Sequence, residues 1–214
     1  TASVTAYNRA GAAAVPASWQ FQVVPLVVAS PAGNVATPRP TINWNAVAGS
    51  KTYNVVVESL TTGTIAINQT ITTASVIAPA VPNRFTPTAD LPLGRYRVRV
   101  RATDAADLPG DWSPDVNFTV KIAPVLTAPA ESVTTLRPTI TWNPVAGATT
   151  YNVLLMFFTD SGVPPMTTTV SGTSWTPTVD LKLGEYRVAV EGFNANGESG
   201  GVSAVKKFLV QPAP

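Results

Sequence analysis

The densest set of chemically active side chains in this sequence is a group of four aspartates: Asp104, Asp107, Asp111 and Asp115. Carboxylates at short spacing can bind calcium, which takes about six to eight oxygen ligands. The spacing is not that of an EF-hand loop, and the corresponding loop later in the chain carries Asn194, Asn196 and Glu198 instead. We therefore favour a solvated acidic loop over a calcium site.

Catalysis has few residues to use, because the 214-residue chain contains no histidine and no cysteine. The usual general base, the commonest metal ligand and the thiolate nucleophile are therefore missing. Serine or carboxylate chemistry remains conceivable, but the acids form no recurring pair. Asp90 and Asp180 each precede a tyrosine at a predicted corner, where hydrogen bonding within the turn accounts for them. The sequence predicts no catalytic residue, no cofactor and no bound metal.

One predicted strand carries an arginine at every second position: Arg95, Arg97, Arg99 and Arg101. Because side chains alternate between the two faces of a strand, these arginines share one face. One hypothesis is a groove for anions or polysaccharides. The other is a structural stack of arginine and aromatic side chains, formed by Arg97, Arg99 and Arg101 with Trp112. We favour the stack, because the equivalent strand later in the chain carries mixed residues at these positions: Glu185, Arg187, Ala189 and Glu191.

A second surface hypothesis concerns residues 151–158. If the odd-numbered residues from 151 to 157 face the core, then Leu154, Met156 and Phe158 face outward. The outward residues on the corresponding strand of the first unit are more polar: Asn54, Val56 and Glu58. An apolar outer face on one unit only is a candidate protein contact surface. The alternative is that a bulge or the loop around Pro164 covers it, and the sequence is equally compatible with both.

The chain contains the same segment twice. The sequence Arg-Pro-Thr-Ile-Asn-Trp at 39–44 returns as Arg-Pro-Thr-Ile-Thr-Trp at 137–142, an offset of 98 residues. A second shared block starts at Phe85 and again at Trp175, an offset of 90 residues. The eight-residue difference between these offsets predicts a loop insertion in the first unit, between Ala74 and Asn83. A period of this length is one small domain, too long for a solenoid unit.

These offsets predict two complete domains and a remnant. We assign residues 25–121 and 122–214 to complete β-domains, and residues 1–24 to the C-terminal strands of a preceding, incomplete one. Apolar and polar residues alternate around Trp44 and Tyr53, a pattern typical of half-buried strands. Prolines recur at the predicted junctions, near Pro124 and Pro212, where they would act as semi-rigid spacers. An elongated array is therefore expected.

The overall composition limits the partners. Charged residues make up 12% of the chain and the net charge is +2, which does not indicate a nucleic-acid partner. No apolar run reaches the length of about 18 residues that a membrane-spanning helix needs. The absence of cysteine is compatible with export without proving it. Residues 68–70 and 117–119 match the N-glycosylation sequon, which matters only in a secretory pathway.

Three pairs of residues carry a resemblance to a known family: the tryptophans Trp44 and Trp142, the tyrosines Tyr53 and Tyr151, and the Leu-x-x-Gly-x-Tyr corners that end at Tyr96 and Tyr186. These motifs resemble the fibronectin type III domain of bacterial surface and secreted repeat proteins. The resemblance implies an all-β fold of tandem, immunoglobulin-like sandwiches with seven strands, a corner tyrosine bonded to backbone, and no active site. The family's Arg-Gly-Asp adhesion loop is missing, so integrin binding is not carried over.

We therefore expect a non-catalytic structural or spacer region of a large extracellular or cell-surface protein, whose lateral sheet contacts could build a fibre or surface layer. Its expected partners are other copies or neighbouring domains of the same protein. The alternative is a ligand- or glycan-binding adhesin module, or an accessory domain of a secreted polysaccharide-degrading enzyme, with a cell-surface glycan or protein as partner. Exposed aromatic rings would mark that alternative, and the candidates are Trp19, Trp112 and Phe158.

Overall fold

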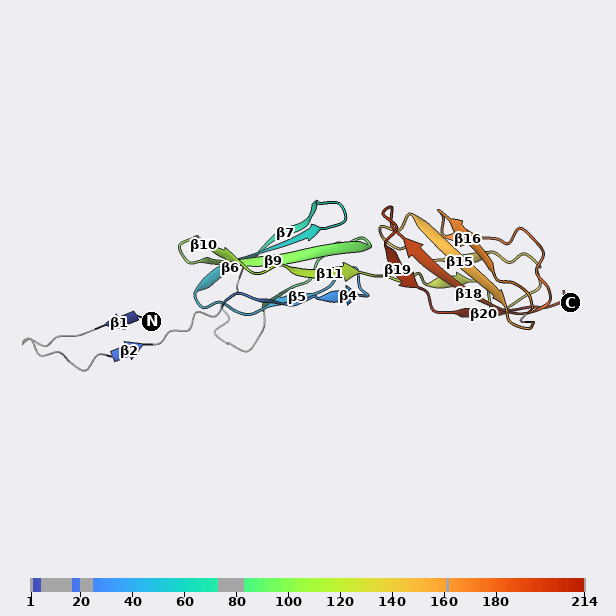
Figure 1. Cartoon of the computed structure of the whole chain (residues 1–214), viewed down its shortest axis with the longest axis horizontal. Helices are drawn as coiled ribbons and strands as arrows, with labels where there is room; N and C mark the ends of the chain where they lie inside the picture. Colours follow the sequence, from blue (N-terminus) through green and yellow to red (C-terminus); the bar gives the residue numbers. More distant parts are fainter. Residues whose placement is uncertain (1, 5–16, 20–24, 73–82, 161, 214) are drawn as a thin grey trace, which may run out of the picture.

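The computed structural model describes residues 2–4, 17–19, 25–72, 83–160 and 162–213. In these ranges every regular element is a β-strand, so the predicted all-β class is confirmed. No helix in the described ranges is long and apolar enough to cross a membrane. Two β-sandwiches lie end to end along the longest axis of the molecule (Figure 1).

The first sandwich packs a three-stranded sheet against a larger one. In the small sheet the strand order is β3 (Val28–Ser30), β5 (Ile42–Trp44) and β8 (Asn83–Phe85). In the large sheet it is β4 (Gly33–Val35), β11 (Val116–Val120), β9 (Gly94–Asp104), β6 (Ser50–Ser59) and β7 (Ile65–Thr72), with β10 (Pro109–Trp112) paired to β9. The chain thus crosses between the sheets and returns, which is the connectivity of a Greek-key sandwich.

The second sandwich repeats this order strand for strand. Its small sheet contains β12 (Leu126–Ala128), β14 (Ile140–Trp142) and β17 (Ser174–Trp175). Its large sheet contains β13 (Ser132–Val133), β20 (Lys206–Val210), β18 (Gly184–Phe193), β15 (Thr150–Phe157) and β16 (Met166–Val170), with β19 (Ser199–Val202) paired to β18. The repeated sequence therefore encodes a repeated topology.

The first strand of each sandwich is divided between its two sheets. In the first unit β3 is antiparallel to β5, whereas β4 is parallel to β11 in the opposite sheet. In the second unit β12 is antiparallel to β14, and β13 is parallel to β20 in the opposite sheet. A cis peptide bond lies between the two halves in each case, at Pro31 and at Pro129.

Each sandwich has its own core, in which tryptophan and tyrosine from neighbouring strands are packed together. The Trp44 and Tyr53 ring centroids lie 5.4 Å apart, and those of Trp142 and Tyr151 also lie 5.4 Å apart. As the resemblance implied, the hydroxyl of Tyr96 donates to the carbonyl oxygen of Pro92 at 2.8 Å. Alternation along the strands places these side chains inward, so the predicted sandwich cores are confirmed.

Two sequence predictions fall largely on residues that lie outside the described ranges. The proposed insertion between Ala74 and Asn83 is one of them, since description resumes only at Asn83. In residues 1–24, only β1 (Ala2–Val4) and β2 (Ala17–Trp19) are described, and they pair antiparallel. The assignment of residues 1–24 to the last strands of an incomplete domain stays a prediction.

Candidate functional site at the junction of the two sandwiches

An extended polar network joins one sandwich to the other. The first sandwich contributes the turn after β6, which contains Thr61, and the corner before β9, which contains Leu93. The second contributes the turn before β15, which contains Ala146, and the loop between β18 and β19, which contains Asn194 and Glu198. Turns at facing ends of two sandwiches are therefore the elements that form this junction.

Backbone hydrogen bonding links the corner of the first sandwich directly to the second. The Leu93 amide donates to the carbonyl oxygen of Ala146 at 2.8 Å. The Leu93 carbonyl oxygen in turn accepts a hydrogen bond from Asn194 Nδ2 at 3.2 Å. Leu93 is only 3% exposed, because the second sandwich covers it. Both backbone groups of one residue are thus satisfied across the junction, as buried backbone groups require.

Glu198 is the charged centre of the junction. Its Oε2 accepts from Asn194 Nδ2 at 2.8 Å and from Thr61 Oγ1 at 2.9 Å, and its Oε1 accepts from Arg95 Nε at 2.8 Å. Its side chain is 23% exposed. Burial would raise the pKa of Glu198, but the hydrogen bonds from Asn194, Thr61 and Arg95 outweigh it and hold the pKa below its usual value.

The loop that presents Glu198 is held in shape by its own residues. Asn194 Oδ1 accepts hydrogen bonds from the amides of Asn196 and Glu198, at 3.0 and 2.9 Å. Gly197 adopts a φ of 76°, the left-handed conformation that glycine reaches without a steric penalty. Asn194 therefore shapes the loop through its oxygen and contacts the first sandwich through its nitrogen.

Two glycines allow the sandwiches to approach this closely. A Cβ atom on Gly147 would lie 2.8 Å from the Cβ of Pro92, and one on Gly200 would lie 2.5 Å from the carbonyl oxygen of Ile122. Ile122 itself packs against the hydrophobic cores of both sandwiches. The junction thus combines an apolar residue in the linker with close backbone contact on either side.

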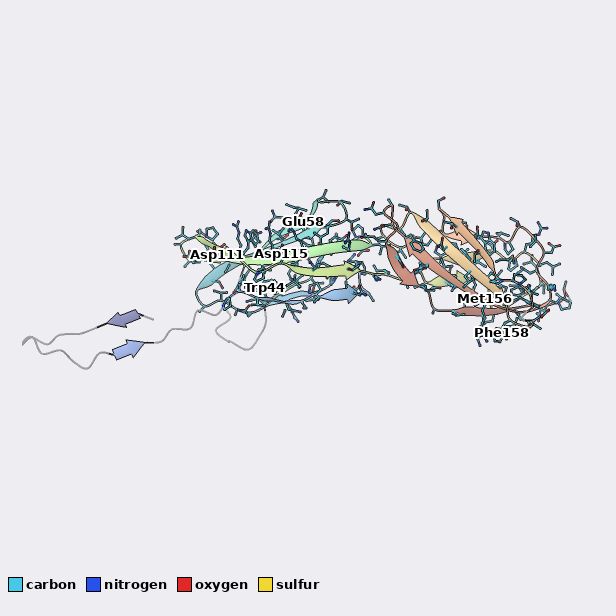
Figure 2. The ribbon with its side chains drawn as sticks, in the orientation of Figure 1. Trp44, Glu58, Asp111, Asp115, Met156 and Phe158 are labelled. Carbon is cyan, nitrogen blue, oxygen red and sulfur yellow. The ribbon has the colours of Figure 1, made fainter. Side chains whose placement is uncertain are left out.

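The arginine strand of the first sandwich divides into three separate arrangements, one of which is the ion pair of Arg95 with Glu198 at the junction. The guanidinium carbons of Arg99 and Arg101 lie 4.7 and 4.6 Å from the centroid of the Trp112 ring. Arg97 lies apart from this stack and pairs with Glu58 at 2.8 Å and with Asp115 at 3.1 Å. Figure 2 labels both of these acids on the first sandwich. Arg97, Arg99 and Arg101 are thus engaged by side chains of their own sandwich.

The four aspartates of the acidic group have different roles. Asp104 accepts hydrogen bonds from two amides of its own loop, and Asp107 pairs with Lys51 at 2.8 Å. Asp115 pairs with Arg97, while Asp111 is exposed. Among the described residues, no group of three or more acids could hold a metal ion.

The predicted apolar face on β15 is partly covered and partly exposed. Leu154 and Met156 are half-buried, while Phe158 is 54% exposed with the guanidinium carbon of Arg187 3.2 Å above its ring. Met156 and Phe158 lie in the half of the second sandwich that is farther from the junction (Figure 2). Beside Leu154 runs a groove of about 530 Å³, whose other lining residues include Thr167, Ala189 and Val202.

The sequence pattern does not identify the junction, although three of its residues, Asn194, Asn196 and Glu198, lie in the loop that corresponds to the acidic loop of the first unit. The sequence feature that points to this loop is the pair of glycines that flank Glu198, at positions 197 and 200, because glycine allows a tight loop to approach another backbone.

No protein-family model matches the chain, and no curated protein matches it either. The solved structures do match. A two-domain fibronectin type III segment of chicken tenascin aligns with a TM-score of 0.60 and 16% identity, over 87% of this chain and 97% of that one. The chicken interferon gamma receptor alpha chain aligns with a TM-score of 0.52 and 13% identity, over 90% of this chain and all of that one. The two sandwiches have the fibronectin type III fold, in tandem.

Proposed function

We propose that this chain is a non-catalytic structural region of an extracellular or cell-surface protein, in which sandwiches stacked end to end act as a stiff spacer. The junction is the observation that carries this proposal. Hydrogen bonds from Leu93, Thr61 and their partners join the sandwiches at points outside the linker. A chain that only needed to connect two independent domains would require none of them.

The hydrogen bonds of the junction oppose bending between the two sandwiches, because they connect different points on the facing ends. Motion between domains is the usual expectation when an interface is small and polar. Here the backbone bond at Leu93 and the side-chain bonds at Glu198 come from separate turns of the first sandwich. A tilt that preserves one of these contacts lengthens another, and hydrogen bonds weaken steeply when their geometry is lost. The two sandwiches should therefore move as one rod.

Glycine substitution tests this proposal with a matched control. Gly200→Ala places a Cβ 2.5 Å from the carbonyl oxygen of Ile122 in the linker, whereas Gly110→Ala, at the equivalent position of the first unit, places one 3.5 Å from the carbonyl oxygen of Ala102 in its own sandwich. Neither glycine is among those with positive φ, so the variants differ in contact rather than in backbone strain.

The distance between spin labels would report the effect. The chain has no cysteine, so labels can be attached at Asn117→Cys and Lys207→Cys, exposed positions on β11 and β20. We expect a narrow distance distribution in the otherwise unmodified chain and in Gly110→Ala, and a broad or shifted one in Gly200→Ala. A broad distribution in the otherwise unmodified chain would contradict the stiff-spacer proposal.

Lateral assembly through Leu154, Met156 and Phe158 is the second part of the proposal, because these side chains lie on the outer face of β15 or just beyond its end. Association with another copy or a neighbouring domain would cover Phe158 and the groove beside Leu154. Met156→Lys should leave both sandwiches folded and abolish that association. Sedimentation velocity at high protein concentration measures it, and an unchanged sedimentation coefficient would reject this contact.

The adhesin alternative receives less support from the exposed aromatic rings. Sugar rings stack on free aromatic faces, but Trp112 carries two guanidinium groups and Phe158 carries one. The side-chain environment of Trp19 lies outside the described part of the chain. A glycan array probed with the whole chain tests the alternative directly, and reproducible binding would favour it over the spacer.

A further inference from the structure

The far end of the second sandwich repeats the surface that the first sandwich uses at the junction. Leu183 is the equivalent of Leu93 in the shared Leu-x-x-Gly-x-Tyr corner, yet Leu183 is 51% exposed and Leu93 is 3% exposed. The difference arises because the second sandwich covers Leu93. Leu183 therefore presents the equivalent of this docking residue as an exposed apolar side chain.

The hydroxyl of the junction is repeated as well. In the first unit Thr61 Oγ1 accepts from the Arg95 amide at 3.1 Å, and in the second Thr159 Oγ1 accepts from the Glu185 amide at 2.8 Å. The corner and the turn thus hold the same relative position in both units. Thr159 is exposed at this end, whereas the hydroxyl of Thr61 is bonded to Glu198.

The charge at this end is reversed. Glu185 occupies the position of Arg95, whose guanidinium pairs with Glu198 of the next sandwich. Glu185 has a long 3.4 Å contact with Arg187 and its side chain remains 42% exposed. A partner that docks here in the same way would place its own counterpart of Glu198 against a carboxylate. Like charges in that position are unfavourable, whereas a basic side chain would form the ion pair in reverse.

The opposite end of the first sandwich does not supply such a partner. At the position of Glu198 the first sandwich has Leu108, which is 65% exposed, and at the position of Asn194 it has Asp104, which cannot donate a hydrogen bond. Asp107 lies in the same loop, where it pairs with Lys51. Glu185 of one copy would therefore face Leu108 rather than a basic side chain at this position, and a head-to-tail stack of identical chains would lack the ion pair.

We propose that the end of the second sandwich formed by Leu183, Thr159 and Glu185 is a docking surface for a further sandwich of the same fold, one that carries lysine or arginine at the position of Glu198. The proposal rests on the stiff-spacer function and adds to it a rule for which domain can follow which. Leu183 supplies the contact common to both junctions, and Glu185 supplies the selectivity.

A three-domain fusion tests this rule. A second copy of residues 125–214 is joined directly after Pro214, because Ala213-Pro214 stands where Ala123-Pro124 stands in the first linker. One fusion keeps Glu198 in the added copy, and the other carries Glu198→Lys there. Labels at Lys207→Cys in the second and third sandwiches measure the new junction. Labels at Asn117→Cys and Lys207→Cys in the first two sandwiches of the same fusions measure the existing one.

We expect the Glu198→Lys fusion to give a distribution at the new junction as narrow as that at the existing junction. The fusion that keeps Glu198 should give a broad one. Equal widths of the distance distribution at the new junction would overturn the proposal. If both distributions are narrow, Glu185 does not select the partner. If both are broad, this end of the sandwich is not a docking surface. A broad distribution at the existing junction would instead refute the stiff spacer itself, so the two failures are distinguishable.

Discussion

Replacing Glu198 with glutamine isolates the contribution of charge to the junction, because the two side chains have nearly the same shape. Three donors reach the carboxylate at 2.8 to 2.9 Å: Asn194 Nδ2, Thr61 Oγ1 and Arg95 Nε. Glutamine keeps one acceptor oxygen but turns an amide NH₂ toward at least one of these donors. We expect the junction to weaken while both sandwich cores remain folded.

The exposure of the partners sets the size of the effect. Hydrogen bonds to a charged group contribute about 1.5 to 3 kcal/mol, and those between neutral groups about 0.5 to 1.5 kcal/mol. The side chain of Arg95 is 63% exposed, so solvent screens its ion pair and the pair adds well under about 1 kcal/mol. The weakened bonds from Asn194 and Thr61 therefore dominate, and the free energy of docking should fall by about 1 to 2 kcal/mol.

Thermal unfolding at neutral pH measures this loss. The contacts of the junction stabilise whichever sandwich unfolds first, so the lower of the two transitions should move by about 4 to 8 °C for each kcal/mol lost. Glu131→Gln is the matched control, because Glu131 is an exposed acid on the same sandwich. It should leave both transitions where they are.

The pH dependence supplies the decisive comparison. Because the folded-state pKa of Glu198 lies below the ordinary value of 4.5, its stabilisation is present at neutral pH and is lost as the pH falls through the folded-state pKa. The unmodified chain and Glu198→Gln should therefore differ at neutral pH and converge once the pH has fallen below the folded-state pKa of Glu198. A difference that persists undiminished at the lower pH, or none at the higher, would refute this account of the junction.

Three further substitutions test the cores and the close approach at the junction. The pKa of Tyr96 is raised to about 12 by burial and by Glu198, so the free energy of unfolding should fall as the pH rises from about 10 to about 12. Tyr96→Phe should reduce that fall, which alkaline denaturation measures. An unchanged pH profile would contradict a role for the Tyr96 hydroxyl in it. Trp142→Ala should cost about 3 to 5 kcal/mol and lower only one of two calorimetric transitions, whereas a shift in both would indicate a single merged core. Gly147→Ala should lower the free energy of unfolding more than Gly49→Ala, since both glycines have a positive φ but only a Cβ at Gly147 lies within 3 Å of the other sandwich. Equal losses of stability in calorimetry would argue against that contact.

Much of the fold could be predicted from the sequence because the signals for it are local. Alternation places Trp44 and Tyr53 on the inward face of adjacent strands, and their return at Trp142 and Tyr151 identifies a second unit. The same parity rule predicts that Met156 and Phe158 lie off the core face. It does not predict how far neighbouring side chains cover them, which is why Arg187 above Phe158 was not foreseen.

The junction could not be predicted in the same way, because its contacts join residues that are far apart in sequence. Arg95 and Glu198 belong to different sandwiches and are 103 positions apart. Parity specifies which face of a sheet a residue occupies, but the junction is made by turns at the ends of strands, where the period of two no longer applies. The relative rotation of two sandwiches is also absent from the sequence pattern of either one.

A comparison of the two units separates what the repeat keeps from what it varies. The core tryptophan, the core tyrosine and the corner that holds the leucine are common to both. Two of the residues that differ in charge lie at the ends: Arg95 is replaced by Glu185, and Leu108 of the first unit by Glu198 of the second. Since core packing depends on shape and the junction on charge, the ends can change without disturbing the fold. In this arrangement the cores make the sandwiches interchangeable as folded units, and the charges at their ends determine the order in which they can stack.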